Sequence, residues 1–186
     1  MARMLLYHTG YHEIREPDLQ RGRKNADFGQ GFYLSPNGEF AGKWAKERKD
    51  ASTFVNAYEL ELEGLEVLRF SRDEDWFTYI FRNRAGYGDS HPEADVIIGP
   101  IANDTIYDTL GILTSGFLSK EQALRLLQIG PDYEQIAVKT VKAATQLRWL
   151  SARTLESGEL ARFREQVLRE EEAYQRLLAE TLEHME

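Results

Sequence analysis

The stretch Asp27-Phe28-Gly29-Gln30-Gly31-Phe32-Tyr33-Leu34-Ser35 carries much of the information about the fold of this chain. Two glycines separated by one residue precede three apolar residues, and Ser35-Pro36-Asn37-Gly38 then gives a strong turn signal. This pattern predicts a very short strand over 32–34. Because glycine has no side chain to block a close approach, Gly29 and Gly31 predict that the backbone here lies against something flat or large.

Strand and helix patterns alternate on both sides of this stretch. Apolar runs or period-two alternation predict strands at 4–8, 54–62, 94–101, 135–139 and 147–150. Helical spacing and capping residues predict helices at 39–51, 73–84, 103–115, 119–130 and from Ser157 almost to Glu186. Strands come first, with short helices between them and further strands after. This order predicts an α+β fold and not a doubly wound parallel sheet.

Composition places the chain among folded soluble domains. It has 186 residues, of which 42% are hydrophobic, and this is typical of one domain. The absence of cysteine excludes a disulfide scaffold, a zinc ribbon and thiol catalysis. No run of about 18 apolar residues is present, and the apolar stretch at the N-terminus is too short for a signal peptide. We therefore expect a cytoplasmic protein without membrane contact.

Charge and motif templates narrow the chemistry further. The net charge of -8 disfavours broad binding to a nucleic-acid backbone, but the window 15–48 is rich in lysine and arginine and favours a small anionic ligand. The patterns GxxxxGK[ST], HExxH and GxSxG do not occur. The spacing of the four histidines suits no metal, so we expect none. They are His8, His12, His91 and His184.

Three residues suggest a site for a planar ring joined to a sugar. Tyr33 and Trp44 lie eleven residues apart, on a strand and the following helix, where they can sandwich a planar ring. His8 ends the opening strand and can hydrogen-bond a ribose hydroxyl. The alternative is that these residues are ordinary core aromatics and a structural histidine.

Together the segments resemble ADP-ribosyltransferases of the poly(ADP-ribose) polymerase or diphtheria-toxin type. They resemble more closely a bacterial ADP-ribosyltransferase-like family of the domain of unknown function 3990 type. The motifs shared with that family occur in the same order over roughly 4–150. They are Leu6-Tyr7-His8, Pro17-Asp18-Leu19, Gly22-Arg23, Asp27 to Ser35, Trp44-Ala45, Ile97-Ile98-Gly99-Pro100, Ala102-Asn103-Asp104 and Gln135-Ile136.

The resemblance implies a split-sheet ADP-ribosyltransferase fold over 1–152, followed by a C-terminal helical extension over 153–186. It implies NAD as a substrate and a catalytic triad in which His8 holds the adenosine-side ribose. Tyr33, and with it Trp44, would stack on nicotinamide.

The resemblance also implies further cofactor contacts. Gly31 and Phe32 belong to the motif that contains Tyr33, and Arg23 could meet the pyrophosphate. The resembled enzymes hold the nicotinamide carboxamide through a glycine after the histidine. This chain has Thr9 there, with glycine only at Gly10. Thr9 can make the same backbone contacts only if its φ is negative.

Two residues are candidates for the third member of the triad. Resemblance to the polymerases points to Glu134, whereas resemblance to the bacterial family points to Gln135. Adjacent residues of a strand face opposite sides, so only one of them can enter a cleft. If Ile136 and Val138 face the core, that residue is Gln135.

The implied function is transfer of ADP-ribose to an unidentified acceptor with release of nicotinamide, by a glycosyltransferase that could be the toxin of a toxin–antitoxin or defence pair. The alternative is an inactive nucleotide-binding or partner-binding module of the same fold. The apolar residues of the last helix recur near heptad spacing. They predict either packing on the domain or an exposed helix that binds an antitoxin or a second copy.

Overall fold

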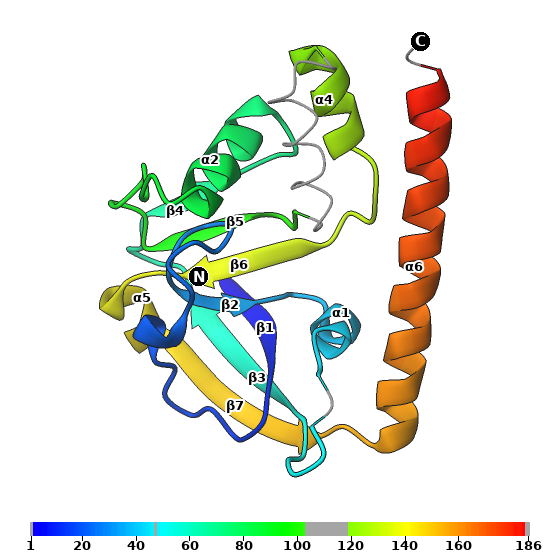
Figure 1. Ribbon diagram of the computed structural model, residues 1–186. Helices are drawn as coiled ribbons and strands as arrows, with labels where there is room; N and C mark the ends of the chain where they lie inside the picture. The colour runs from blue at the N-terminus through cyan, green and yellow to red at the C-terminus, as the bar shows by residue number, and fades with distance from the viewer. Residues whose placement is uncertain (1, 47, 103–118, 185–186) are drawn as a thin grey trace.

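The computed structural model describes residues 2–46, 48–102 and 119–184. The helix expected at 103–115 and its capping pair Asn103-Asp104 lie outside these residues. In the described part of the chain the strands form two sheets (Figure 1). One has the order β1 (Arg3–Gly10), β3 (Phe54–Glu61) and β7 (Leu147–Thr154). The other has the order β2 (Phe32–Leu34), β6 (Glu134–Val138), β5 (Val96–Pro100) and β4 (Val67–Arg69).

Helices lie between and after these strands. They are α1 (Gly38–Lys43), α2 (Glu74–Arg84), α4 (Lys120–Leu127), α5 (Val141–Thr145) and α6 (Ser157–Glu183), with a 3-10 turn, η1, at Leu19–Arg21. The mixed order confirms the predicted α+β class, and the predicted C-terminal helix is present as α6. None of the helices in the described ranges has the length and apolar character needed to cross a lipid bilayer.

Two predicted elements differ from the structure. The helix predicted at 39–51 ends at Lys43, because the residues beyond Ala45 are mostly polar and give a longer helix no apolar face to bury. The strand predicted at 147–150 continues to Thr154, where it stays paired with β3. The expected boundary between 152 and 153 therefore falls within a strand.

The main apolar core lies between the two sheets. Leu6, Tyr58, Leu60 and Leu147 come from one sheet, and Phe32, Leu34, Val96, Ile98, Ile136 and Val138 come from the other. A second apolar cluster covers the opposite face of β5 and β6, where α2 contributes Trp76, Tyr79 and Ile80. Alternate residues of β6 therefore serve different clusters, with Ile136 and Val138 in the first and Ala137 in the second.

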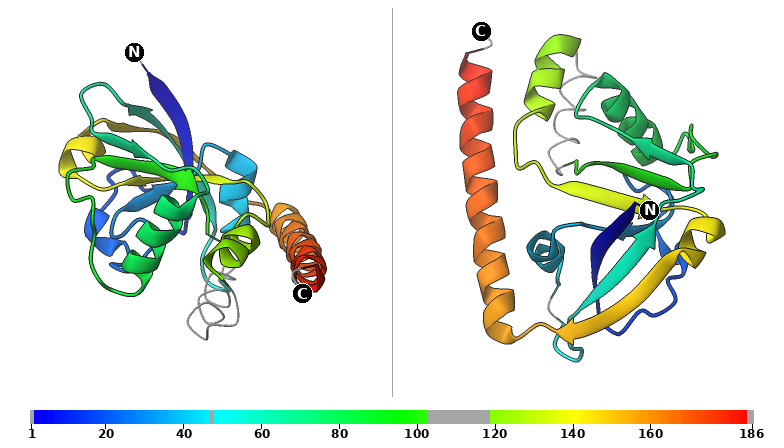
Figure 2. Two further views of the ribbon diagram at one scale, coloured as in Figure 1. Left: turned by 90° about the horizontal axis from the view of Figure 1, so that it is seen from above. Right: turned by 180° about the vertical axis from the view of Figure 1, so that it is seen from behind.

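Helix α6 runs along one side of the molecule, with α1 between it and the sheets (Figures 1 and 2). Its first turns pack through Leu160 and Phe163 against Val55 and Leu155. Tyr174, three turns further on, is also buried. The alternative of packing on the domain is therefore correct for this part of α6.

Candidate functional site

Two clefts share Tyr33 as a lining residue. The first, the His8 cleft, has a volume of about 660 Å³ and is lined by His8, Gly31, Phe32 and residues of the segment 12–22. The second, the Gln135 cleft, has a volume of about 750 Å³. Its lining includes Arg23, Asp27, Tyr33, Trp44, Arg84, Tyr133 and Gln135, together with Glu170 and Tyr174 of α6. Both volumes are in the range of ligand sites, roughly 300–1,000 Å³.

The loop before β2 is held by hydrogen bonds to its main chain. The Asn83 side chain donates to the Asp27 carbonyl at 3.0 Å. The Tyr33 hydroxyl accepts from the Phe28 N–H at 2.9 Å and donates to the Gly29 carbonyl at 2.6 Å. Gly29 has a φ of +76°, in the left-handed region that favours glycine. The Tyr33 hydroxyl is therefore engaged with the loop, and its ring is the part available to a ligand.

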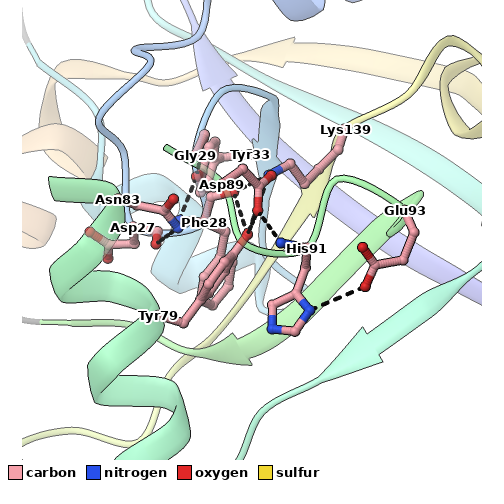
Figure 3. Close-up of polar contacts among 10 residues, drawn as sticks. All are labelled: Asp27, Phe28, Gly29, Tyr33, Tyr79, Asn83, Asp89, His91, Glu93 and Lys139. Carbon is pink, nitrogen blue, oxygen red and sulfur yellow. Dashed lines mark hydrogen bonds and ion pairs between the residues drawn. The ribbon is translucent and has the colours of Figure 1, made fainter. Parts of the chain in front are cut away.

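A partly buried ion pair lies behind the same loop (Figure 3). Lys139 forms an ion pair with Asp89 and also donates to the Phe28 carbonyl at 2.5 Å. The Tyr79 hydroxyl donates to Asp89 at 2.7 Å. Burial alone would raise the pKa of Asp89, but hydrogen bonds from Lys139, the His91 backbone and Tyr79 outweigh it and lower that pKa below its ordinary value. The carboxylate is thus charged at neutral pH and holds Lys139 in place.

Gly31 approaches protein backbone closely. A Cβ at Gly31 would lie 2.7 Å from the Val138 carbonyl oxygen, and one at Gly22 would lie 2.3 Å from the Gly31 oxygen. Both distances are shorter than any van der Waals contact. For Gly31, the close neighbour that the two glycines predicted is therefore the backbone of β6.

The structure separates the two candidates on β6. Gln135 lines the Gln135 cleft, is 6% exposed, and donates from Nε2 to Asp27 Oδ2 at 3.1 Å. Asp27 Oδ1 also accepts from Arg84 Nε at 2.6 Å. Glu134 is exposed and lies on the same side of the strand as Ile136. Of the two, the cleft therefore receives the amide and not the carboxylate.

His8 lies in the other cleft. Its Nδ1 is 2.6 Å from the Tyr33 carbonyl oxygen, and its ring centroid is 4.3 Å from that of Phe32. Burial lowers the pKa of His8, and this outweighs the opposing effect of the Tyr33 carbonyl. Because a carbonyl can only accept, Nδ1 carries the proton in the neutral ring and Nε2 is an acceptor. The His8 ring thus contacts Phe32, whereas the Tyr33 ring packs beside the cluster of α2.

Thr9 and Gly10 lie at the end of β1, paired with Val55 and Phe54. The Thr9 hydroxyl donates to the Ala41 carbonyl of α1. The φ of Thr9 is not positive, as the expected backbone contact requires. Within the described part of the chain, however, the walls of the two clefts do not include Thr9 or Gly10.

Helix α6 closes one side of the Gln135 cleft. Lys43 of α1 donates to both Glu170 and the Tyr133 hydroxyl, and Tyr133 donates to Glu170 at 2.7 Å. The Tyr133 ring stacks on Phe40 at 4.1 Å, and Trp44 meets Phe40 edge-on at 4.8 Å. Side chains of α1 and its C-cap Trp44, of Tyr133 directly before β6, and of α6 thus form one aromatic and charged wall.

No group of three His, Cys, Asp or Glu within the described ranges is placed to hold a metal ion. The cations of the Gln135 cleft are Arg23, Lys43, Lys46 and Arg84, and its carboxylates are Asp27, Glu170 and Glu171. The cations exceed the carboxylates by one, and Lys43 and Arg84 are paired with Glu170 and Asp27. The cleft is therefore slightly positive in a protein whose net charge is -8.

A family model described as "Protein of unknown function (DUF3990)" matches residues 4–149. The chain belongs to the DUF3990 family. The match covers both sheets and ends within β7, before α6. Neither a curated protein nor a solved structure matches this DUF3990 protein.

Sequence reasoning assigned no role to several residues that build the site. Asp27 was part of the stretch that predicted β2, but its bonds to Arg84 and Gln135 join positions 57 and 108 residues away. Lys139, Asp89 and Glu170 carry no local signal, because a single lysine or carboxylate is usually a solvated surface residue.

Proposed function

We propose that this protein binds NAD and is an NAD-dependent ADP-ribosyltransferase, with the nicotinamide half of NAD in the Gln135 cleft. One observation carries the proposal: Arg23, Tyr33, Trp44 and Gln135, from four separate segments, line a single cleft. These are residues that the resemblance to ADP-ribosyltransferases assigns to NAD. Membership of the DUF3990 family is compatible with this proposal but names no activity.

In this proposal the Tyr33 ring stacks on nicotinamide, with Trp44 as a second aromatic, and Arg23 meets the pyrophosphate. His8 receives the adenosine-side ribose in the His8 cleft, which shares Tyr33 with the Gln135 cleft. Its Nε2 would accept a hydrogen bond from a ribose hydroxyl.

The proposed reaction breaks the bond between C1′ of the ribose and the nicotinamide nitrogen. The bonding electron pair leaves with nicotinamide, which becomes neutral, and positive charge develops on the ribose. An acceptor then bonds to C1′ and loses a proton. Gln135 can orient the ribose, but a glutamine cannot act as a general base. The acceptor must therefore be a nucleophile that needs no base from this residue.

Incubation of the full chain with NAD tests the proposal directly. With NAD alone, where water is the acceptor, we expect nicotinamide and ADP-ribose to form in equal amounts. With labelled NAD and a cell lysate, we expect labelled ADP-ribose to become attached to a component of the lysate. If the chain binds no NAD by calorimetry, the assignment of the cleft is wrong.

A second candidate is a nucleotide-binding module of the same fold without turnover. It is favoured by the position of Gln135 in the cleft where a triad carboxylate would be expected, whereas Glu134 is exposed and lies on the other side of the strand. Calorimetric binding of NAD without any release of nicotinamide would establish this alternative.

A further inference from the structure

Asp27 connects the amide of Gln135 to a buried arginine. One carboxylate oxygen of Asp27 lies 2.6 Å from Arg84 Nε, and the other lies 3.1 Å from Gln135 Nε2. The side chains of Arg84 and Asp27 are 8% and 15% exposed. The Asn83 side chain donates a hydrogen bond to the main-chain carbonyl of Asp27. The carboxylate is therefore fixed both at its backbone and at each of its oxygens.

This arrangement determines which end of the Gln135 amide faces Asp27. A carboxylate can only accept hydrogen bonds, so the NH₂ group must point toward it. Arg84 occupies the other oxygen and opposes rotation of the carboxylate. The amide oxygen, which is the negative end of the amide dipole, is then the acceptor that Gln135 offers to a ligand.

We propose that Asp27 is a positioning residue that turns the oxygen of the Gln135 amide toward the ribose of NAD. This inference rests on the proposed function. Positive charge develops on the ribose as nicotinamide leaves, and an oriented carbonyl dipole stabilises such charge without reorganising. Asp27 thus compensates in part for the absence of a carboxylate at position 135.

The substitution Asp27→Asn reverses this geometry. Arg84 can only donate, so the oxygen of the new amide stays on Arg84 and its NH₂ group faces Gln135. Gln135 must then rotate, which presents its own NH₂ group to the ribose. A ribose hydroxyl can donate or accept, so NAD still binds. The developing charge now meets the positive end of the dipole.

Nicotinamide release from NAD alone measures the effect. In Asp27→Asn we expect kcat to fall on the order of tenfold to a hundredfold, with KM changed less than about threefold. The double variant Asp27→Asn, Gln135→Glu should recover kcat to within about threefold of the native chain. In it the asparagine NH₂ group donates to the new carboxylate, whose second oxygen faces the ribose. The single variant Gln135→Glu completes the cycle: with native Asp27 the two carboxylates repel each other, so a positioning role predicts that Gln135→Glu raises kcat only in the presence of Asp27→Asn. A merely structural role for Asp27 predicts that Gln135→Glu changes kcat by the same factor with and without Asp27→Asn.

Circular dichroism is the check that each variant is folded. The double variant keeps the combined charge of the side chains at positions 27, 84 and 135. If Asp27→Asn has the kcat of the native chain, or if the double variant is no faster than Asp27→Asn, the positioning role is wrong while the proposed function stands. If the native chain itself releases no nicotinamide, the transferase function is wrong and the positioning role is rejected with it.

Discussion

The two sides of the Gln135 cleft are held in different ways. On the side of β2, hydrogen bonds from Asn83, Tyr33 and Lys139 reach the main chain of residues 27–29. Their donors and acceptors come from α2, from β2 and from Lys139 directly after β6, so the loop is tied to both the sheet and the helix that covers it. A main chain restrained at each successive residue has little freedom to move.

On the other side, α6 is held by side chains. Glu170 meets Lys43 and Tyr133, and the apolar contacts of Leu160 and Phe163 lie two to three turns earlier. Beyond Tyr174 the helix continues for more than two turns with Leu177 exposed. The comparison indicates one fixed side, which defines the shape of the cleft, and one side whose opening costs only a few side-chain contacts.

The largest expected effect is on the fixed side. Lys139→Met removes the partner of Asp89 and a donor to the Phe28 carbonyl. The Asp89 side chain is 24% exposed and keeps its hydrogen bonds from Tyr79 and the His91 N–H. We therefore expect a decrease of about 2–3 kcal/mol in the free energy of unfolding, less than for a fully buried pair. Urea denaturation followed by circular dichroism measures it.

The matched control is Lys139→Met combined with Asp89→Asn, which should lose less stability because no charge remains unpaired.

The lowered pKa of Asp89 also predicts how stability depends on pH. Its pKa is lower in the folded protein than in the unfolded chain, so its contribution to stability is present above pH ~4 and is lost as the pH falls through the folded pKa. Below pH ~4 the free energy of unfolding should therefore fall less steeply with decreasing pH in Asp89→Asn than in the native chain. The same slope in both proteins would contradict the assigned pairing.

Gln135→Ala tests the catalytic role proposed for Gln135, on the fixed side. Because the proposed contact with the ribose would act mainly in the transition state, we expect kcat for nicotinamide release to fall on the order of a hundredfold while KM changes little. Glu134→Ala, on the opposite face of the same strand, should have little kinetic effect. A large loss in Glu134→Ala alone would show that β6 contributes the other residue to the reaction.

Tyr33 is expected to act through its ring in binding and through its hydroxyl in holding the loop. Tyr33→Ala should weaken NAD binding by about 1–3 kcal/mol in calorimetry, the range for the loss of a stacked aromatic contact. Tyr33→Phe keeps the ring and removes the bonds to Phe28 and Gly29. Tyr33→Phe should lower the melting temperature of the protein, and it should weaken NAD binding less than Tyr33→Ala does. Native affinity in Tyr33→Ala would exclude Tyr33 as the stacking residue.

The sequence alone was sufficient where the pattern is local. Period-two alternation identified β3 and the face of β6 that carries Gln135, and helical spacing identified α2 and α6. It failed for β4, because a three-residue strand paired in parallel with β5 has too short a pattern to detect. It also overestimated α1, which ends where apolar residues stop.

The candidate site was only partly predictable for a related reason. His8, Tyr33, Trp44 and Gln135 were found through their motifs, but the motifs do not show that His8 and the Tyr33 ring contact different apolar clusters. Lys139 lies 50 residues from Asp89 and 111 from Phe28. Such contacts arise only when the sheet and α2 come together in the folded chain.

The smallest expected effect is on the α6 side. Lys43→Met removes the donor shared by Glu170 and Tyr133, but Glu170 is partly exposed and regains water. We expect local opening of α6 around 170–182 to become about fivefold more frequent, which corresponds to about 1 kcal/mol. Native-state hydrogen exchange measures this opening. Arg169→Ala, which breaks a solvent-exposed pair with Glu165 on the same helix, is the matched control and should leave exchange at these amides nearly unchanged. Equal exchange in Lys43→Met and the native chain would mean that the apolar anchors alone hold α6, and the contrast between a fixed and an openable side of the cleft would be lost.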